Sequence, residues 1–105
     1  MIKILNEGNF TQETASGITL VDFYADWCGP CKVLTPILEG ISEKSTARIC
    51  KVDVEKNRTL AQQFGVRSIP LLVILKDGKP VEQMLGLKDE STILEMIQRH
   101  ESTQA

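Results

Sequence analysis

Hydrophobic and polar positions along the chain form short runs typical of strands, separated by stretches with helical spacing. The runs that predict strands cover residues 2–5, 18–24, 47–54, 71–76 and 80–85. The run 18–24 is apolar at nearly every position, which suits a strand covered on both faces. In the run 47–54, Cys50, Val52 and Val54 fall on one face and predict that this face is buried.

Four helices are predicted between these strands. They run from about 10 to 16, 30 to 44 and 57 to 64, with a last helix that follows Asp89. Asn9, Asn57 and Asp89 stand at the expected N-cap positions, and Gly17 and Gly65 end the first and third helices. The apolar positions expected to face the core are Val33, Leu34, Ile37, Leu38 and Ile41 in the second helix, and Ile93, Leu94, Met96 and Ile97 in the last.

The order of these elements predicts an α/β fold. Asp77-Gly78 lies between the last two strands and is a strong hairpin signal, so these strands are expected to be antiparallel. The earlier strands alternate with helices, which favours a central sheet with helices on both faces. A chain of 105 residues fits one domain, residues 1–105, and can form a core without disulfide bonds.

Charge and hydropathy exclude several classes of partner. The formal net charge is −2 and no basic stripe is visible, which argues against nucleic acid. The longest clean apolar run, 71–75, is too short to cross a bilayer, so no membrane association is expected. The first apolar residues break into Asn6-Glu7-Gly8 too soon for a signal peptide, which favours a cytoplasmic location.

The chain contains three cysteines, and two of them form a close pair, Cys28-Gly29-Pro30-Cys31. In a reducing compartment such a pair is more often catalytic or metal-binding than structural. A zinc site needs at least three protein ligands, and the remaining candidates are Cys50 in a predicted core strand and His100 near the far end. We therefore expect no metal and no bound cofactor, and we expect Cys50 to be an inert buried thiol.

The pair lies where a buried strand is followed by a helix, which suits redox chemistry. Residues three apart on a helix have β-carbons about 5–6 Å apart, and a disulfide needs about 4 Å, so a small adjustment closes the bond. Cys28 is expected at the helix N-terminus, where unpaired amides stabilise an anion by roughly 0.3–2 kcal/mol. That lowers the thiol pKa, and the thiolate is the nucleophile.

Several further motifs, in order along the chain, carry a resemblance to a known family. The segment Trp27-Cys28-Gly29-Pro30-Cys31 follows Val21-Asp22-Phe23-Tyr24-Ala25-Asp26, and the later matches are Pro36, Lys51 with Asp53, Ile69-Pro70, Asp77-Gly78 and Gly86. Together they cover almost the whole chain and resemble the thioredoxin family. Tyr24 and Leu71 depart from the commonest residues of that family, Trp and Thr.

The resemblance implies a thioredoxin fold with a mixed central sheet and a reversible Cys28–Cys31 disulfide. It also implies that Asp22 lies behind the cysteines and acts as a base for Cys31 through water, with Lys51 as its neighbour. The alternatives from the residues alone are that Asp22 is an edge carboxylate facing water and that Lys51 is a simple charge partner. Both stay open at this stage.

The resemblance implies a docking surface for protein substrates as well. It makes Pro70 a cis proline and leaves the Ile69 backbone free to pair with an extended segment of the substrate. The residues assigned to this surface are Trp27, Gly29, Pro30, Ile69, Pro70 and Gly86. From the residues alone, the position of Trp27 beside Cys28 favours a docking surface over a core aromatic, whereas Gly86 would usually be a plain strand end.

The predicted function is the reduction of disulfides in other proteins by a monomeric carrier. By resemblance, a thioredoxin reductase that uses NADPH or ferredoxin restores the dithiol. The alternative is a binding module that uses the same surface as a chaperone or assembly subunit without redox turnover. The presence of both cysteines argues against that alternative.

Overall fold

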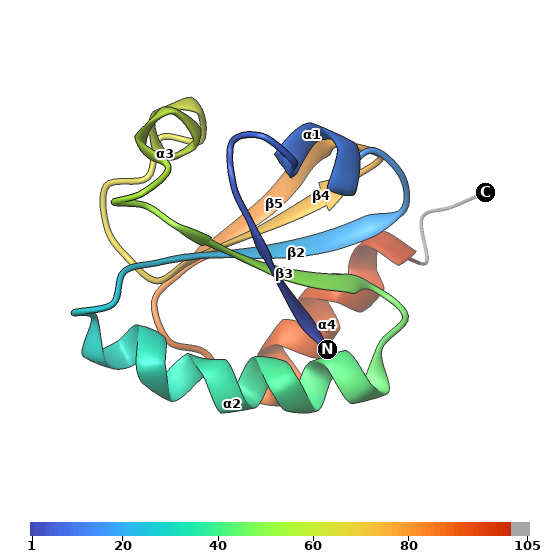
Figure 1. Cartoon of the computed structure of the whole chain (residues 1–105). Coiled ribbons are helices and arrows are strands. Elements are labelled where there is room, and N and C mark those ends of the chain that lie inside the picture. The colour runs from blue at the N-terminus through green and yellow to red at the C-terminus, as the bar shows by residue number, and fades with distance from the viewer. Residues whose placement is uncertain (102–105) are drawn as a thin grey trace.

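The computed structural model describes residues 1–101. Its elements follow the predicted order and are β1 (Ile2–Leu5), α1 (Phe10–Glu13), β2 (Ile18–Tyr24), α2 (Gly29–Lys44), β3 (Arg48–Asp53), α3 (Arg58–Gln63), β4 (Leu71–Lys76), β5 (Lys79–Leu85) and α4 (Glu90–Glu101) (Figure 1). The expectation of one domain over residues 1–105 includes four residues outside the described range and stays a prediction.

Five strands form one mixed sheet in the order β1-β3-β2-β4-β5. Strands β1, β3 and β2 run parallel, whereas β4 pairs antiparallel with both β2 and β5. The prediction of a mixed sheet with an antiparallel hairpin is therefore confirmed. Because β2 and β3 are parallel neighbours, their carboxyl ends meet at one end of the sheet, where side chains from several elements converge.

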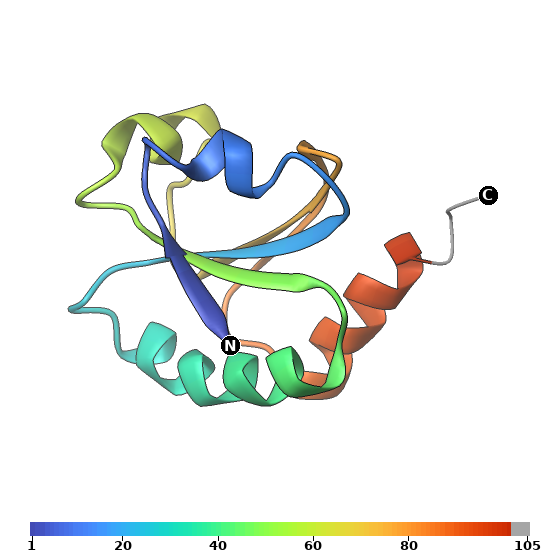
Figure 2. The ribbon, with the colours of Figure 1, turned by 45° about the vertical axis from the view of Figure 1, so that its right-hand side comes forward.

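Helices cover both faces of this sheet, as the sequence predicted. In Figure 1, α2 and α4 lie below the sheet and α1 and α3 above it, and the turned view in Figure 2 keeps this division. The core under α2 and α4 contains Leu20, Leu34, Leu38, Ile49, Leu72 and Met96. The core under α1 and α3 contains Phe10, Val21, Phe23, Cys50, Val52 and Leu60.

Alternation along the two central strands decides which side chains face which helices. In β2, Leu20 belongs to the core under α2 and α4, and Val21 belongs to the opposite core. Since side chains of a strand alternate, Asp22 faces the helix α2 with Leu20. The same alternation in β3 places Lys51 on the face of Ile49 and Cys50 on the other face.

The first helix is shorter than predicted and is not capped by Asn9. It ends at Glu13 instead of 16, and Thr14 follows it with its hydroxyl donating to the carbonyl of Phe10. The Asn9 side chain accepts from the amide of Asn6 instead of from the helix, so it stabilises the preceding turn. Gly17 has the positive φ of 76° that ends such a segment.

Two other details differ from the sequence prediction. Asn57 makes no cap to α3, because its side chain accepts from the amide of Glu7 and donates to the carbonyl of Asp53. The Glu7 carboxylate accepts from the Thr59 amide at the start of α3 instead. Val33 in α2 is 53% exposed, so its predicted burial is wrong, whereas the cap by Asp89 on the Thr92 amide is confirmed.

Candidate active site at the start of helix α2

The two cysteines of the close pair lie at the first turn of α2. Cys28 is the N-cap residue with extended backbone angles, and the helix begins at Gly29, one residue earlier than predicted. Cys28 and Cys31 are joined by a disulfide across a Cα–Cα distance of 5.3 Å. Both are buried, and the spacing of three residues lets the bond form across the first turn of the helix.

The backbone of this turn provides a hydrogen bond to sulfur. The amide of Cys31 donates to Sγ of Cys28 at 3.2 Å. This amide is one of the donors that a helix leaves unpaired at its N-terminus. After reduction, the same donor and the helix dipole would favour a thiolate at Cys28 over a neutral thiol.

Asp22 and Lys51 lie beneath this turn, on the sheet face that α2 covers. They are register partners on β2 and β3. Asp22 is completely buried, and neither carboxyl oxygen has a hydrogen-bond partner among the described residues. The alternative of an edge carboxylate facing water is therefore wrong. Burial raises the pKa of Asp22 to about 7, and the positive charge of Lys51 opposes this shift.

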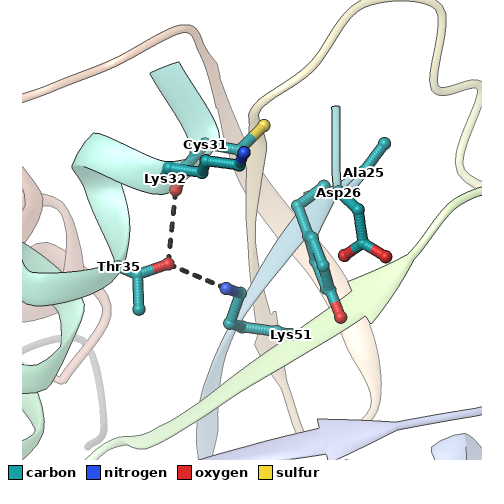
Figure 3. Close-up of a pocket in the computed structure, with 7 residues that line it drawn as sticks. Ala25, Asp26, Cys31, Lys32, Thr35 and Lys51 are labelled. Carbon is teal, nitrogen blue, oxygen red and sulfur yellow. Dashed lines mark hydrogen bonds between the residues drawn. The ribbon is translucent and has the colours of Figure 1, made fainter. Parts of the chain in front are cut away.

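A small cavity of about 90 Å³ opens beside this pair (Figure 3). It is lined by Tyr24, Ala25, Asp26, Cys31, Lys32, Thr35 and Lys51. Its size is sufficient for water, and its lining offers polar groups to hold it. The cavity therefore brings Cys31 and the Lys51 ammonium to one solvated space.

The predicted docking residues gather at the same end of the sheet. The Ile69–Pro70 bond is cis, as the resemblance implied. Strand β4 begins at Leu71, opposite Phe23, so Pro70 lies at the end of β2 that leads to the cysteines. The amide of Gly86, a residue with φ of 93°, donates to the carbonyl of Pro70 at 2.9 Å and joins the end of β5 to this loop.

Trp27, Gly29 and Pro30 form the exposed side of the cysteine turn. Trp27 is 68% exposed, so the alternative that it is a core aromatic is wrong. Its indole nitrogen donates to the carboxylate of Glu55 at 2.8 Å, just after the end of β3. Gly29 and Pro30 are exposed as well, which leaves the turn open to an approaching chain.

The sequence prediction missed Glu55 and Thr35. Glu55 comes two residues after β3, and the expected meeting of strand ends was a signal that could have found it. Thr35 lies one helical turn after Cys31, where its hydroxyl donates to the Cys31 carbonyl at 3.3 Å and accepts from the Lys51 ammonium at 2.8 Å. Spacing along α2 indicated the first contact, but the second depends on the packing of α2 on β3.

Cys50 and His100 lie apart from this site. Cys50 is fully buried on the opposite face of the sheet, and burial raises the pKa of its thiol to about 11. The His100 ring nitrogen Nε2 lies 2.7 Å from the carboxylate of Glu82 on β5. Over residues 1–101, no group of three or more His, Cys, Asp or Glu residues could hold a metal ion. In the same range no helix is long and apolar enough to span a membrane.

Comparisons with known proteins agree with this geometry. The thioredoxin family model matches residues 1–99. A thioredoxin from Chlamydia muridarum is 47% identical over 102 residues, covering 96% of this chain and all of that protein. A thioredoxin from Bacillus subtilis is 42% identical over 94 residues, covering 88% of this chain and 90% of that protein.

Solved structures show the same fold. A mutant thioredoxin from Halobacterium salinarum superimposes with a TM-score of 0.88 at 37% identity, over 93% of this chain and 88% of that one. A reduced Schistosoma mansoni thioredoxin gives a TM-score of 0.84 at 28% identity, over 93% of this chain and 96% of that one. With its paired cysteines and these relatives, the chain belongs to the thioredoxin family of thiol–disulfide oxidoreductases.

Proposed function

We propose that Cys28 is the attacking thiolate and Cys31 the resolving thiol in the reduction of protein disulfides. The thiolate of Cys28 attacks one sulfur of the substrate disulfide, forming a mixed disulfide and releasing the other substrate sulfur as a thiolate. Cys31 then attacks Cys28, which releases the second substrate thiolate and leaves the Cys28–Cys31 disulfide. Two electrons pass from the cysteine pair to the substrate, and each released thiolate takes up a proton.

The observation that carries this assignment is the Cys31 amide that donates to Sγ of Cys28. It distinguishes the two sulfurs, because the N-cap sulfur receives the helix amide and dipole. Cys28 also lies next to the exposed residues Trp27 and Gly29, whereas Cys31 faces the cavity on the side of the sheet. The more accessible sulfur is thus also the one whose thiolate is better stabilised.

Asp22 is proposed as the proton acceptor for Cys31, acting through water. A pKa of about 7 gives it comparable populations of both forms at neutral pH, which is where a general base is effective. The cavity that reaches Cys31 supplies space for the water. Lys51 is proposed to limit the rise of the Asp22 pKa, since its charge acts against desolvation.

The docking surface is proposed to consist of Trp27, Gly29, Pro30, Ile69, Pro70 and Gly86. A substrate segment in an extended conformation would pair with the Ile69 backbone, in the manner of strand addition. The exposure of Trp27 and the bond from Gly86 to Pro70 support this arrangement, because the ring is open to contact with a partner and the Pro70 loop is fixed to the end of β5.

The partners of such a carrier are disulfide-containing proteins, as for the family in general. We propose in addition that a thioredoxin reductase, dependent on NADPH or ferredoxin, restores the dithiol, that no further cofactor is bound, and that the carrier acts as a monomer in the cytoplasm. The charge of −2 without a basic stripe supports the exclusion of nucleic acid as a partner.

The direct test is the reduction of insulin by dithiothreitol, followed by the turbidity of the released chains. The protein is expected to accelerate precipitation, and Cys28→Ser is expected to reduce the rate to that of dithiothreitol alone. Equal rates with and without the protein would refute the assignment. A Cys28→Ser/Cys31→Ser double variant that still supports every cellular role would favour the binding module instead.

A further inference from the structure

Thr35 joins the resolving cysteine to the charged pair beneath it. Its hydroxyl donates to the carbonyl of Cys31 at 3.3 Å and accepts from the ammonium of Lys51 at 2.8 Å, as the dashed lines in Figure 3 show. The Thr35 hydroxyl thus donates its single proton to a carbonyl of α2, and one of its lone pairs accepts a hydrogen bond from a side chain of β3. Thr35 also lines the cavity beside Cys31.

The Lys51 ammonium is held from a second side by an aromatic ring. Its nitrogen lies 4.2 Å from the centroid of the Tyr24 ring, within the range of a cation–π contact. Lys51 and Asp22 are register partners, so their side chains leave the same face of the sheet. Even so, neither oxygen of Asp22 receives a hydrogen bond, and the ammonium is instead bonded to Thr35 and placed over the Tyr24 ring.

The distance between this cation and the carboxyl decides how Asp22 titrates. A positive charge in close contact lowers a carboxyl pKa by about 1–3 units, whereas full burial raises it by up to about 3–5 units. For Asp22, burial is the larger effect, and its pKa is raised to about 7. A contact ion pair with Lys51 would offset part of the effect of burial, lower the Asp22 pKa and leave a weaker base.

We propose that Thr35 is a positioning residue that holds the Lys51 ammonium off the Asp22 carboxyl and thereby sets the pH range in which Asp22 accepts a proton. The proposal rests on the assigned role of Asp22 as the base for Cys31. Thr35 acts through Lys51 and touches neither the substrate nor the reacting sulfurs.

Among the charged groups around Asp22, Lys51 is the cation whose position Thr35 is proposed to control. The titratable groups near Asp22 or the adjacent cavity are Lys51 from β3, Cys31 and Lys32 from α2, Tyr24 from β2 and Asp26 from the loop after it. On the β4 side the register partner is the apolar Leu72. Among these groups, Lys51 is the one whose charge lowers the Asp22 pKa.

The first test measures the ionisation of Asp22 in the oxidised protein, in which Cys28 and Cys31 do not titrate. The carboxyl carbon of Asp22 is followed by ¹³C NMR as a function of pH in the wild type, Thr35→Val and Thr35→Ser. Thr35→Val removes the acceptor at constant shape, and the midpoint is expected to fall by about one unit. Thr35→Ser keeps the hydroxyl and is expected to leave the midpoint unchanged.

Two further variants check that the effect passes through Lys51. Thr35→Ala is expected to lower the Asp22 midpoint as Thr35→Val does. Because alanine favours the helix, Thr35→Ala takes the place of Thr35→Val if the valine variant folds poorly. In a Lys51→Met background, Thr35→Val is expected to cause no further shift. An unchanged midpoint in both Thr35→Val and Thr35→Ala, or an equal shift with and without Lys51, would overturn the proposal.

The second test follows the resolving step in the reduced protein by stopped flow. With an excess of 5,5′-dithiobis(2-nitrobenzoate), the attack of Cys28 releases the first coloured thiolate and the attack of Cys31 releases the second. In Thr35→Val the pH midpoint of the second release is expected to move down with that of Asp22, and its plateau rate to fall about threefold. The rate of the first release is expected to stay the same.

The two tests separate this proposal from the assigned role of Asp22. If Thr35→Val lowers the Asp22 midpoint but the second release does not change, Thr35 positions Lys51 while Asp22 is not the base. If Asp22→Asn slows the second release but Thr35→Val leaves the midpoint unchanged, Asp22 is the base and the proposal for Thr35 is wrong.

Discussion

Cys31 in α2 and Cys50 in β3 are both buried, but they lie on opposite sides of the sheet and their surroundings differ. Cys31 is 2% exposed and Cys50 is 0% exposed. Cys31 belongs to the first turn of α2, beside a polar cavity, and its own amide donates to its partner sulfur. Cys50 lies in the middle of β3 within an apolar cluster under α1 and α3.

This comparison teaches that burial alone does not decide whether a cysteine reacts. Burial raises the pKa of the Cys50 thiol to about 11, because the charges of Arg48 and Lys3, which lower it, offset only part of the loss of water. At the start of α2, the unpaired amides and the helix dipole offset that loss. Reactivity therefore follows from the backbone donors and the polar groups placed under the turn.

Replacing the cysteines on each side of the sheet is expected to produce the largest difference in activity. Cys28→Ser is expected to abolish insulin reduction, because a hydroxyl at neutral pH supplies almost no anion to attack sulfur. Cys50→Ser is expected to retain the wild-type rate per folded molecule. Turbidity assays at equal concentrations of folded protein measure both. A loss of activity in Cys50→Ser at unchanged folded fraction would contradict the division between the two faces.

Alkylation of the reduced protein examines the same contrast without mutation. At pH 7 a thiol of pKa about 11 is thiolate in about one molecule in ten thousand, whereas the amide and the helix dipole at the start of α2 favour the thiolate of Cys28. Iodoacetamide is therefore expected to modify Cys28 at least a thousandfold faster than Cys50, as read by peptide mass spectrometry. Cys50 is expected to react after unfolding in guanidinium, and rapid labelling of Cys50 in the native protein would oppose this account.

The reactive side was more predictable from sequence than the details of its support. The close spacing of Cys28 and Cys31 and the strand before them predicted the disulfide, and the resemblance predicted the cis bond before Pro70; both are confirmed. The cis bond was predicted from the resemblance alone. Spacing along one element conveys features such as the disulfide. It does not convey contacts between elements, and so Glu55 and the bond from Lys51 to Thr35 were missed.

Contacts between separate segments also limited the prediction of the short helices. Strong apolar periodicity predicted β2, β4 and α2 to within a residue or two. The caps of the short helices were wrong, because Asn9 and Asn57 bond to other segments in the folded chain. Val33 is exposed for a different reason: it lies at the edge of the apolar stripe of α2, where the sheet does not cover it.

The next largest expected effect concerns stability and Asp22. Its folded pKa of about 7 exceeds its ordinary value of 3.8, so between these pH values the folded protein keeps a proton that the unfolded chain has released. Stability therefore falls as the pH rises through this window. Asp22→Asn removes this loss and is expected to stabilise the oxidised protein by about 2–4 kcal/mol at pH 8 and by little at pH 4.

Urea unfolding of the oxidised protein at both pH values measures this difference. Asp26→Asn serves as the matched control, because Asp26 is exposed four residues later and its substitution is expected to change the stability at pH 8 far less than Asp22→Asn does. If Asp22→Asn stabilised the protein equally at pH 4 and pH 8, ionisation of the Asp22 carboxyl would not be what destabilises the folded state at the higher pH.

The smallest effect on stability is expected for substitutions of Cys50, under α1 and α3. There the size and polarity of the side chain decide the stability, and its charge does not. Cys50→Ala removes one buried sulfur from the cluster around Val52 and is expected to cost about 1 kcal/mol, through lost contacts and a small cavity. Cys50→Ser is close to the native size but buries a hydroxyl, which costs about 1–3 kcal/mol without a partner.

Denaturation of both Cys50 variants therefore tests what the thiol contributes. If Cys50 acts as a small hydrophobe, the alanine variant is expected to be the more stable of the two, although it leaves the larger void. If serine were the more stable, the site would have to supply a hydrogen-bond partner, and the α1 and α3 face would then contain a buried polar group, as the face beneath α2 does with Asp22. The order of the two variants thus decides whether the two faces differ in chemistry or only in position.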